Sequence, residues 1–511
     1  MLRAVASGVQ IISLLVYIYV FEQWLLRLFF YFFIVLEGTT IRNIILNIHI
    51  LSLKMLKYSG LRNTAVRSVF RRSISSARPE VTELSNGVAV VSRYNSNATT
   101  STTGFVFGSG AAAESPYNNG ASSIISNLFT KFNRNLNKDA DGKGFQLDSV
   151  VERDYQSYLV TSLPQNTGES LKFLNDSFAK NLKINQSELE TAKKSLLDHM
   201  DRVENEAAFQ EERVLEHLHA TAFQNTPLSL TKTGTVDSVR DLVADDINDF
   251  ATKQFKNSNV VIVNDGNVKH EDFVNMIENE KIQLFSGEKP KQAKGSTFLG
   301  SEVRLRDDTL PKAWISIAVE GESLKSRDYL TSKVAAEIFG QYNAYEPNSR
   351  LQGVKLLDNL QEYQLTESFK HFSLSYKDSG LWGFQTVTPN ISNIDDLVHF
   401  TLKQWNRLTI SVTDTELIRG KQMLKLKLAT EYENGNIVKN ISSIGNSVLV
   451  EAIKPTLAEQ YAAIDAITVS DVKAWASKRL WDQDIAIAGS GQIEGLLDYM
   501  RIRSDMSMMR W

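Results

Sequence analysis

The 511-residue chain contains no cysteine, and this single absence removes several kinds of chemistry together. Disulfide bonds, thiolate metal ligands and cysteine nucleophiles are excluded, and such a chain suits a reducing compartment. An excess of charge is also missing, because 56 basic and 59 acidic residues leave a formal net charge of −3. A nearly neutral chain has no general attraction for phosphate backbones, so nucleic acid is not an expected partner.

Common metal-binding and nucleotide-binding patterns are lacking as well. The seven histidines never form His-x-x-x-His. His217 and His219 lie two residues apart, so on a helix they point to different faces, and packing or capping explains them better than a metal pair. Gly489 and Gly491 follow a predicted strand, but Gly495 comes one residue too late for a dinucleotide-binding fingerprint.

Long apolar runs are confined to the part of the sequence before residue 80. Residues 9–36 look like a membrane span, but Glu22, Gln23 and Arg27 split them into two runs that are each too short to cross a bilayer. Residues 1–54 have two open explanations. They represent an upstream start or a misread gene boundary, or else they form a genuine signal anchor.

Residues 55–79 are rich in arginine and serine and contain no acidic residue, which is typical of a mitochondrial transit peptide. A transit peptide should start the chain, so Met55 is the expected initiator, and the mature protein should begin near residues 73–80. After residue 80 no apolar run reaches eighteen residues, so membrane attachment of the mature protein would have to come from partners.

From residue 80 onward the sequence predicts alternating strands and helices, and the alternation occurs twice. In the first half we expect a hairpin with Asn86 and Gly87 at its turn, a glycine-terminated strand, two further strands, and helices over 166–182 and 186–220. In the second half AWISIAVEGE and FSLSYKDSGLWGFQTVTP match the strands of the first.

One internal match needs no gap. Residues 246–266 (DINDFATKQFKNSNVVIVNDG) align with residues 471–491 (DVKAWASKRLWDQDIAIAGSG), and each copy is an amphipathic helix followed by a buried strand and a turn. A period this long indicates a duplicated domain. The sequence therefore predicts α+β domains at 80–284 and 303–511, joined by a linker at 285–302 with the composition of Gly, Pro, Ser and Lys.

The stretch NNGASSIISNLFTK (118–131) predicts a helix that follows a glycine turn. Its apolar residues share one stripe: Ile124, Ile125, Leu128, Phe129 and Phe132. The opposite face contains only Ser122, Ser123, Ser126 and Asn127, which are of little use for most catalysis.

The duplicated α+β unit, the presequence-like segment and the motifs GSGAAAESPYNNG, HLHATAFQNTPL and YKDSGLWGF together resemble the pitrilysin family of zinc peptidases. The most similar branch contains the mitochondrial processing peptidase and the core proteins of ubiquinol-cytochrome c reductase. The resemblance covers essentially everything after residue 80. It implies two homologous domains, each a mainly antiparallel sheet flanked by helices, that face each other around a cavity.

The resemblance also implies where a zinc site would lie. Active members have His-x-x-Glu-His on the helix after this turn, and the pattern places those three residues at Ser123, Ser126 and Asn127. The third zinc ligand would fall near His199, with Glu204 and Glu206 close in sequence. Serine and asparagine are poor zinc ligands and cannot act as a carboxylate base, so no metal and no catalytic residue is expected.

In the second domain, active members have an arginine and a tyrosine seven residues apart after Ser-Arg-Leu. Here Ser349-Arg350-Leu351 leads to Leu356 and Tyr363, so only the tyrosine is present. Both sites have lost residues that the family's chemistry needs. A scaffold is therefore a better explanation than an enzyme.

The family then implies a non-catalytic core subunit of respiratory complex III, which supports assembly of the complex on the matrix side of the mitochondrial inner membrane. No haem, quinone, metal or other cofactor is expected in the chain. The implied partners are core protein 2, cytochrome b, cytochrome c1, the Rieske protein, a second copy of the complex and a respiratory supercomplex. Two alternatives stay open: the zinc-dependent processing peptidase itself, and its non-catalytic presequence-binding subunit.

Overall fold

The computed structural model describes residues 79–178, 184–282, 284–285, 287–290, 295–346, 354–434, 436–450 and 456–508. The predicted extension at 1–54, the predicted transit peptide except Pro79, and the Ser349-Arg350-Leu351 triplet lie outside these residues. The described residues belong to one compact unit that spans Ser76–Trp511. Within it, the elements β1 to α10 form a first lobe and the elements β7 to α18 form a second lobe.

The first lobe is built on a six-stranded sheet whose spatial order is β1-β2-β6-β3-β5-β4. Its strands are β1 (Glu80–Glu83), β2 (Ala89–Tyr94), β3 (Ser101–Phe107), β4 (Gln146–Val151), β5 (Gln156–Ser162) and β6 (Val260–Gly266). The β1–β2 hairpin is the predicted one, with Gly87 at a φ of +81° in its turn, where glycine has no steric penalty. All pairs are antiparallel except β2 with β6.

Seven α-helices of this lobe are α3 (Ala121–Asn127), α4 (Arg134–Lys143), α5 (Thr167–Phe178), α6 (Gln186–Asn205), α8 (Val236–Asp241), α9 (Ala244–Gln254) and α10 (His270–Glu280). An eighth, α7 (Gln210–Ala222), leaves the lobe. The buried side chains of α3, α5, α6, α9 and α10 share one core with alternate residues of the sheet, such as Phe105 and Phe107 of β3.

The second lobe repeats this plan. Its sheet has the order β7-β12-β8-β11-β10-β9, with strands β7 (Ser301–Arg306), β8 (Ala313–Glu320), β9 (Gln341–Asn343), β10 (Ser368–Ser375), β11 (Gly380–Thr388) and β12 (Ala486–Gly491). The single parallel pair is β7 with β12, in the place of β2 with β6. The predicted duplication and the mainly antiparallel sheets are therefore confirmed.

The helices of the second lobe are α11 (Tyr329–Phe339), α12 (Lys355–Glu362), α13 (Ile394–Ile410), α14 (Asp414–Asn434), α15 (Ile437–Leu449), α16 (Leu457–Ala466), α17 (Val469–Arg479) and α18 (Tyr499–Met508). The gapless repeat corresponds to α9–β6 and α17–β12. Helix α17 begins with a capping box in which Thr468 and Asp471 satisfy each other's backbone N–H groups, a standard helix start.

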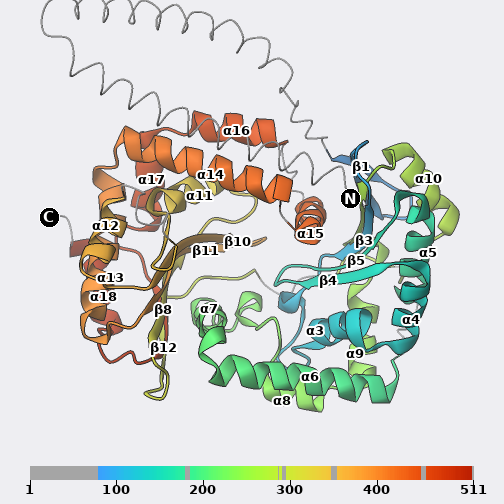
Figure 1. Cartoon of the computed structure of the whole chain (residues 1–511), viewed down its shortest axis with the longest axis horizontal. Helices are drawn as coiled ribbons and strands as arrows, with labels where there is room; N and C mark the ends of the chain where they lie inside the picture. The colour runs from blue at the N-terminus through green and yellow to red at the C-terminus, as the bar shows by residue number, and fades with distance from the viewer. Residues whose placement is uncertain are drawn as a thin grey trace, which may run out of the picture. The chain divides into compact units, whose positions relative to one another are not determined.

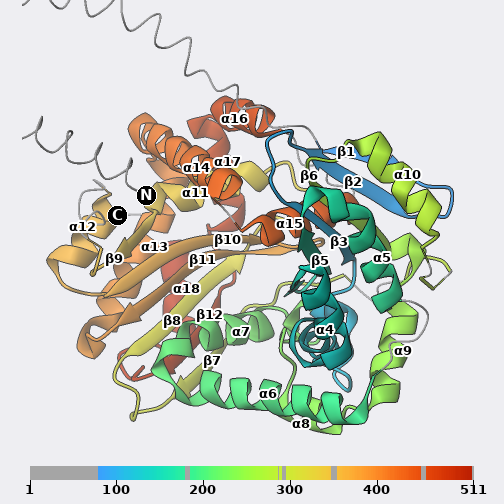
Figure 2. The ribbon, with the colours of Figure 1, turned by 45° about the vertical axis from the view of Figure 1, so that its right-hand side comes forward.

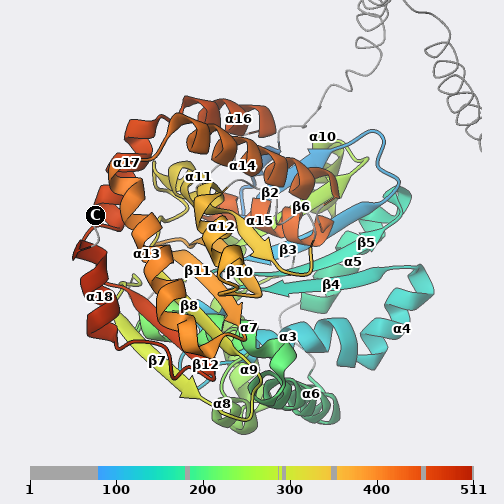
Figure 3. The same ribbon diagram turned by 60° about the vertical axis from the view of Figure 1, so that its left-hand side comes forward.

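The lobes exchange one helix each. Helix α7 of the first lobe packs on β7, β8 and β12 of the second sheet, and α15 of the second lobe packs on β3 and β6 of the first (Figures 1 and 2). Each sheet is thereby covered on both faces, which explains why β3 and β8 are buried along nearly their whole length. Figure 3 shows α14 running beside α16 and ending near α15.

The expected helix over 186–220 is wrong in one respect, because the structure divides it at Glu206. The backbone of Glu206 is extended, a short turn follows, and α7 then takes a new direction toward the second sheet. The buried side-chain amide of Gln210 donates to the carbonyl groups of Val203, Glu204 and Glu206. Gln210 thus provides hydrogen-bond donors for carbonyl groups at the C-terminal end of α6, and it is also the first residue of α7.

Candidate functional site

The start of helix α3 is fixed by a buried carboxylate. Gly120 has a φ of +103° just before the helix, and a Cβ there would lie 2.8 Å from Val239, so only glycine fits this turn. The Glu114 carboxylate accepts hydrogen bonds from the backbone N–H groups of Gly120 and Ser122, at 2.8 and 2.7 Å. Burial raises the pKa of Glu114 to about 7, although these hydrogen bonds act in the opposite direction.

The predicted apolar stripe of this helix is confirmed. Ile124, Ile125 and Phe129 are buried in the first core, and Leu128 and Phe132 are partly buried against it. After Asn127 the helix widens into a π-helical segment, Leu128–Phe132. The polar face is less uniform than expected, because Ser122 is fully buried.

The three motif positions are half-buried, and the two serines make ordinary hydrogen bonds. The Ser123 hydroxyl donates to the Lys232 carbonyl at 2.6 Å, and the hydroxyl groups of Ser126 and Ser149 are 2.6 Å apart. These bonds attach α3 to the loop before α8 and to strand β4. The ammonium group of Lys232 lies 3.6 Å from the Glu152 carboxylate, in a half-exposed ion pair.

The region predicted for the third ligand lies at the C-terminal end of helix α6. His199 of α6 is half-buried, with its ring edge-on to Phe209 at 6.0 Å between centroids. Glu204 lies 3.7 Å from Arg213, and its side chain is 63% exposed. The described part of the chain holds no group of three or more His, Cys, Asp or Glu side chains that could bind a metal ion.

Zinc therefore does not fit the residues at these positions. Two hydroxyl groups and an amide are weak ligands for this ion, and both serine hydroxyls already contact protein oxygen atoms. No carboxylate stands at Ser126 to deprotonate a water molecule.

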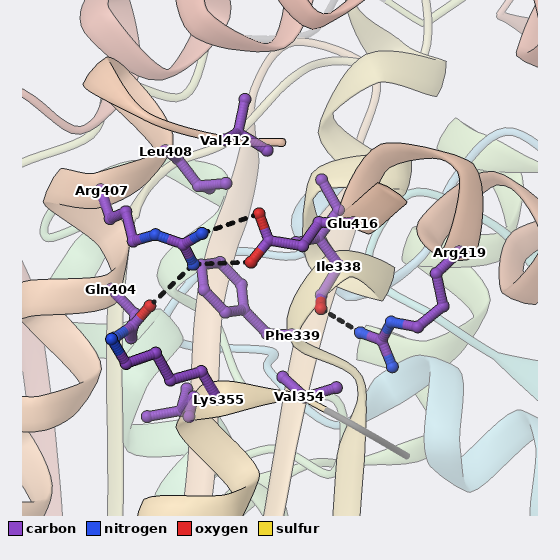
Figure 4. A pocket seen from close by; sticks show the side chains of 11 residues that line it. Ile338, Phe339, Val354, Lys355, Gln404, Arg407, Leu408, Val412, Glu416 and Arg419 are labelled. Atoms are coloured by element: carbon purple, nitrogen blue, oxygen red, sulfur yellow. Dashed lines mark hydrogen bonds and ion pairs between the residues drawn. The ribbon is translucent and has the colours of Figure 1, made fainter. Parts of the chain in front are cut away.

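Of the second-lobe positions, Leu356 lies on α12 and Tyr363 directly follows this helix. Leu356 is 1% exposed in the second core, and Tyr363 is 55% exposed and stacks on Phe400 with the rings 2° from parallel. Leu356 also borders a cavity of about 20 Å³, which has room for about one water molecule. Figure 4 shows this cavity, where the Arg407 guanidinium makes a two-pronged ion pair with Glu416.

A much larger cavity of about 620 Å³ lies between the lobes. The first lobe contributes Arg93 and the β4–β5 turn, and the second contributes residues of α11, β10, α14, α15 and α16. Arg93 is not a free cation, because it pairs with Asp265 and lies 5.2 Å from the ring centroid of Tyr432. None of the five predicted positions, Ser123, Ser126, Asn127, Leu356 and Tyr363, lines this cavity.

Two further histidines, His219 and His270, have structural contacts. His219 is fully buried; its Nδ1 lies 2.7 Å from the Leu215 carbonyl and its Nε2 lies 2.6 Å from the Tyr376 hydroxyl. Burial lowers the pKa of His219 well below its usual value, so the ring is neutral and accepts from Tyr376. His270 bridges Thr82 and Ser92 at 2.7 Å each. The packing interpretation of His219 is confirmed.

The contacts of Glu114, Arg153 and Tyr376 could not be found by sequence reasoning. Arg153 is 2% exposed, and its guanidinium donates to Glu216 at 2.7 Å and to the Leu228 carbonyl at 3.3 Å. A charged residue in a predicted turn normally indicates solvent exposure, and nothing in the local sequence distinguishes this one.

Comparison with known proteins identifies the class. The model described as "Insulinase (Peptidase family M16)" matches residues 89–236, and the model "Peptidase M16 inactive domain" matches residues 241–424. This chain belongs to peptidase family M16, as the resemblance predicted.

Three individual matches narrow the comparison. The mitochondrial cytochrome b-c1 complex subunit 1 of Saccharomyces cerevisiae is 58% identical over 454 residues, which cover 87% of this chain and 98% of that protein. The mitochondrial-processing peptidase subunit beta of Neurospora crassa is 34% identical over 89% of this chain and 98% of its own length. A chain in the solved structure "Complex III2 from Candida albicans, Inz-5 bound" has a TM-score of 0.76 and 36% identity, covering 84% of this chain and all of that one.

Proposed function

We propose that the chain is a non-catalytic core subunit of mitochondrial complex III, ubiquinol-cytochrome c reductase, and that it supports assembly and stability of the complex. The observation that carries this proposal is the 58% identity to the yeast complex III subunit, over 98% of the length of that subunit. The replacement of the metal-site residues by Ser123, Ser126 and Asn127 agrees with a structural role. The chain contributes protein surface to the complex and no redox centre.

The proposed position is peripheral, on the matrix side of the inner membrane. Among the described residues no helix has the length and apolarity needed to cross a membrane. We infer that core protein 2, cytochrome b, cytochrome c1 and the Rieske protein are its partners, within a dimeric complex that also enters respiratory supercomplexes. Interfaces of permanent complexes are large and apolar, and the two lobes offer the surface for them.

The second candidate is a subunit of the mitochondrial processing peptidase, favoured by the 34% identity to the Neurospora subunit beta. Ser126 argues against the catalytic form, because the general base of metal-assisted hydrolysis would have to be a carboxylate. A presequence-binding role without catalysis is compatible with the same residues.

Native gel electrophoresis of mitochondria in mild detergent tests both functions. If the chain is a core subunit, it migrates in a large band that also absorbs as b-type and c-type haem. Migration as a small complex without haem would reject this function and favour the processing peptidase. Extraction of membranes with carbonate, and protease treatment with and without an intact inner membrane, test the peripheral and matrix-side position.

A further inference from the structure

The floor of the large cavity contains a ring of contacts among three segments. They are the β4–β5 turn of the first lobe (Glu152–Tyr155), the exchanged helix α7, and the β10–β11 turn of the second lobe (Tyr376–Ser379). Each segment contacts the other two. The ring is called the latch below.

The first side of the latch joins the β4–β5 turn to α7. The buried Arg153 guanidinium donates to Glu216 at 2.7 Å and to the carbonyl of Leu228. A buried charge is stable only with such partners, so Arg153 cannot move away from α7 without leaving Glu216 and itself unpaired. Helix α7 is therefore held to the first lobe although it packs on the second sheet.

The other two sides cross from one lobe to the other. The Tyr376 hydroxyl donates to Nε2 of His219 at 2.6 Å, which joins the β10–β11 turn to α7. The backbone N–H of Lys377 donates to the Asp154 carboxylate at 2.7 Å, which joins the two turns directly. Because three contacts close a triangle, rotation about any one of them is blocked by the other two.

The exchanged helices α7 and α15 also connect the two lobes, through contacts outside the latch. The Ser490 hydroxyl of β12 donates to the Gln210 side chain at 2.8 Å, and the hydroxyl groups of Ser157 and Ser442 lie 2.7 Å apart under α15. All four residues are buried. At Gly445 of α15 the helix comes so near the first sheet that a Cβ would lie 2.7 Å from Val106.

We propose that the latch and the exchanged helices make the two lobes one rigid body, so that the cavity keeps a single width and does not work as a hinged clamp. Glu152, Asp154, Tyr155 and Tyr376 line the cavity as well as taking part in the latch, so the wall of the cavity is the locking element. An opening motion would have to break the two interlobe hydrogen bonds of the latch and those of the exchanged helices, and it would uncover the apolar side of α7. The inference concerns the chain alone and does not depend on its place in complex III.

The absence of cysteine makes the test direct. The test uses the double variant Asp139→Cys on α4 and Gln422→Cys on α14. Both positions are exposed and lie in different lobes, and spin labels attach there without competing thiols in the full chain. Pulsed electron resonance should give one narrow distance distribution. The variant Tyr376→Phe with Asp154→Ala removes both interlobe hydrogen bonds of the latch and should at least double the width of that distribution.

The matched control is Tyr158→Phe, which removes a buried hydroxyl that donates to Gln156 inside the first lobe. Its distribution should stay narrow. A broad or two-peaked distribution in the unaltered chain overturns the proposal, and so does a latch variant no wider than the control. If the double variant fails to fold, Tyr376→Phe alone decides, because its ring packing against His219 is retained.

Discussion

The hydroxyl oxygens of Ser126 and Ser149 lie 2.6 Å apart, so the position predicted to match the family's catalytic glutamate is tied to strand β4. Together with the bond from Ser123 to the Lys232 carbonyl, this contact links α3 to its neighbours, as a metal ion would by binding ligands from several elements. The residues at the predicted site belong to the framework of the fold. Restoring the motif should therefore cost stability.

We predict that the triple variant Ser123→His, Ser126→Glu, Asn127→His binds zinc weakly and does not regain efficient proteolysis. Both framework hydrogen bonds are lost, at about 1 kcal/mol each, and the positions predicted for the third ligand and for the second-lobe arginine, near His199 and at Leu356, hold other residues. Calorimetric zinc titration and cleavage of a basic presequence peptide, with and without chelator, measure the two effects. Rapid, chelator-sensitive cleavage would show that the scaffold is still a competent peptidase.

Glu114 should make the free energy of unfolding decrease as pH rises, which is opposite to the effect of a carboxyl group whose pKa is lowered by folding. Its pKa in the folded chain is about 7 because of burial, above the ordinary 4.5, so folding takes up a proton between these values. The stabilising contribution is complete below pH 4.5 and is lost as pH rises through 7, a change of about 3 kcal/mol.

Urea unfolding of the wild type and of Glu114→Gln at several pH values measures this contribution, since the other titrating groups cancel in the difference. The advantage of the wild type should shrink steadily from pH 4.5 to 7.5. A difference that stays constant, or grows with pH, would show that Glu114 is ionised in the folded chain.

A charge in the apolar stripe of α3 should prevent stable folding. Ile125 is 3% exposed, and Ile125→Asp buries an unpaired carboxylate, for which we expect a loss of at least about 4 kcal/mol. Ile418→Asp is the control, because Ile418 on α14 is 57% exposed and should change stability by less than about 0.5 kcal/mol. Thermal melts compare the two, and equal melting temperatures would contradict the assignment of this face to the core.

Gly445 should tolerate no side chain, because α15 packs closely on the first sheet there. Gly445→Ala forces contacts of 2.7 Å and 3.1 Å with Val106 and Val263, and we expect a loss of about 1–3 kcal/mol. In Gly142→Ala the new methyl group meets nothing within 4 Å on α4, and better helix propensity should add up to about 1 kcal/mol. Opposite shifts in the urea midpoint are expected, and shifts of the same sign would contradict the close approach of α15.

The sequence predicted most features that depend on a local pattern. The hairpin at Gly87, the stripe through Ile124 and Ile125, and the duplicated helix and strand ending at Gly266 and Gly491 follow from spacing and turn chemistry. The family and the neutral motif positions followed from the order of the motifs. The proposed domain boundaries at 284 and 303 stay a prediction.

The helix exchange was outside the reach of such patterns. The apolar side of α7 shows that it must be covered, but Val214 and Leu218 contain no information on which sheet covers them. The break at Glu206 was missed for the same reason, because good helix formers continue on both sides of it. Likewise Asp154 and Lys377 meet across 223 residues, and only the tertiary structure brings them together.

The exchange of helices has a consequence for folding during synthesis of the chain. Helix α7 is fully covered only when β12 has been made, since Ser490 lies 280 residues after its partner Gln210. Until then a growing chain exposes part of the apolar side of α7, and until α15 has been made it also exposes one face of the first sheet; such surfaces attract chaperones and other unfinished chains. Truncation near the C-terminus should therefore harm the first lobe almost as much as the second.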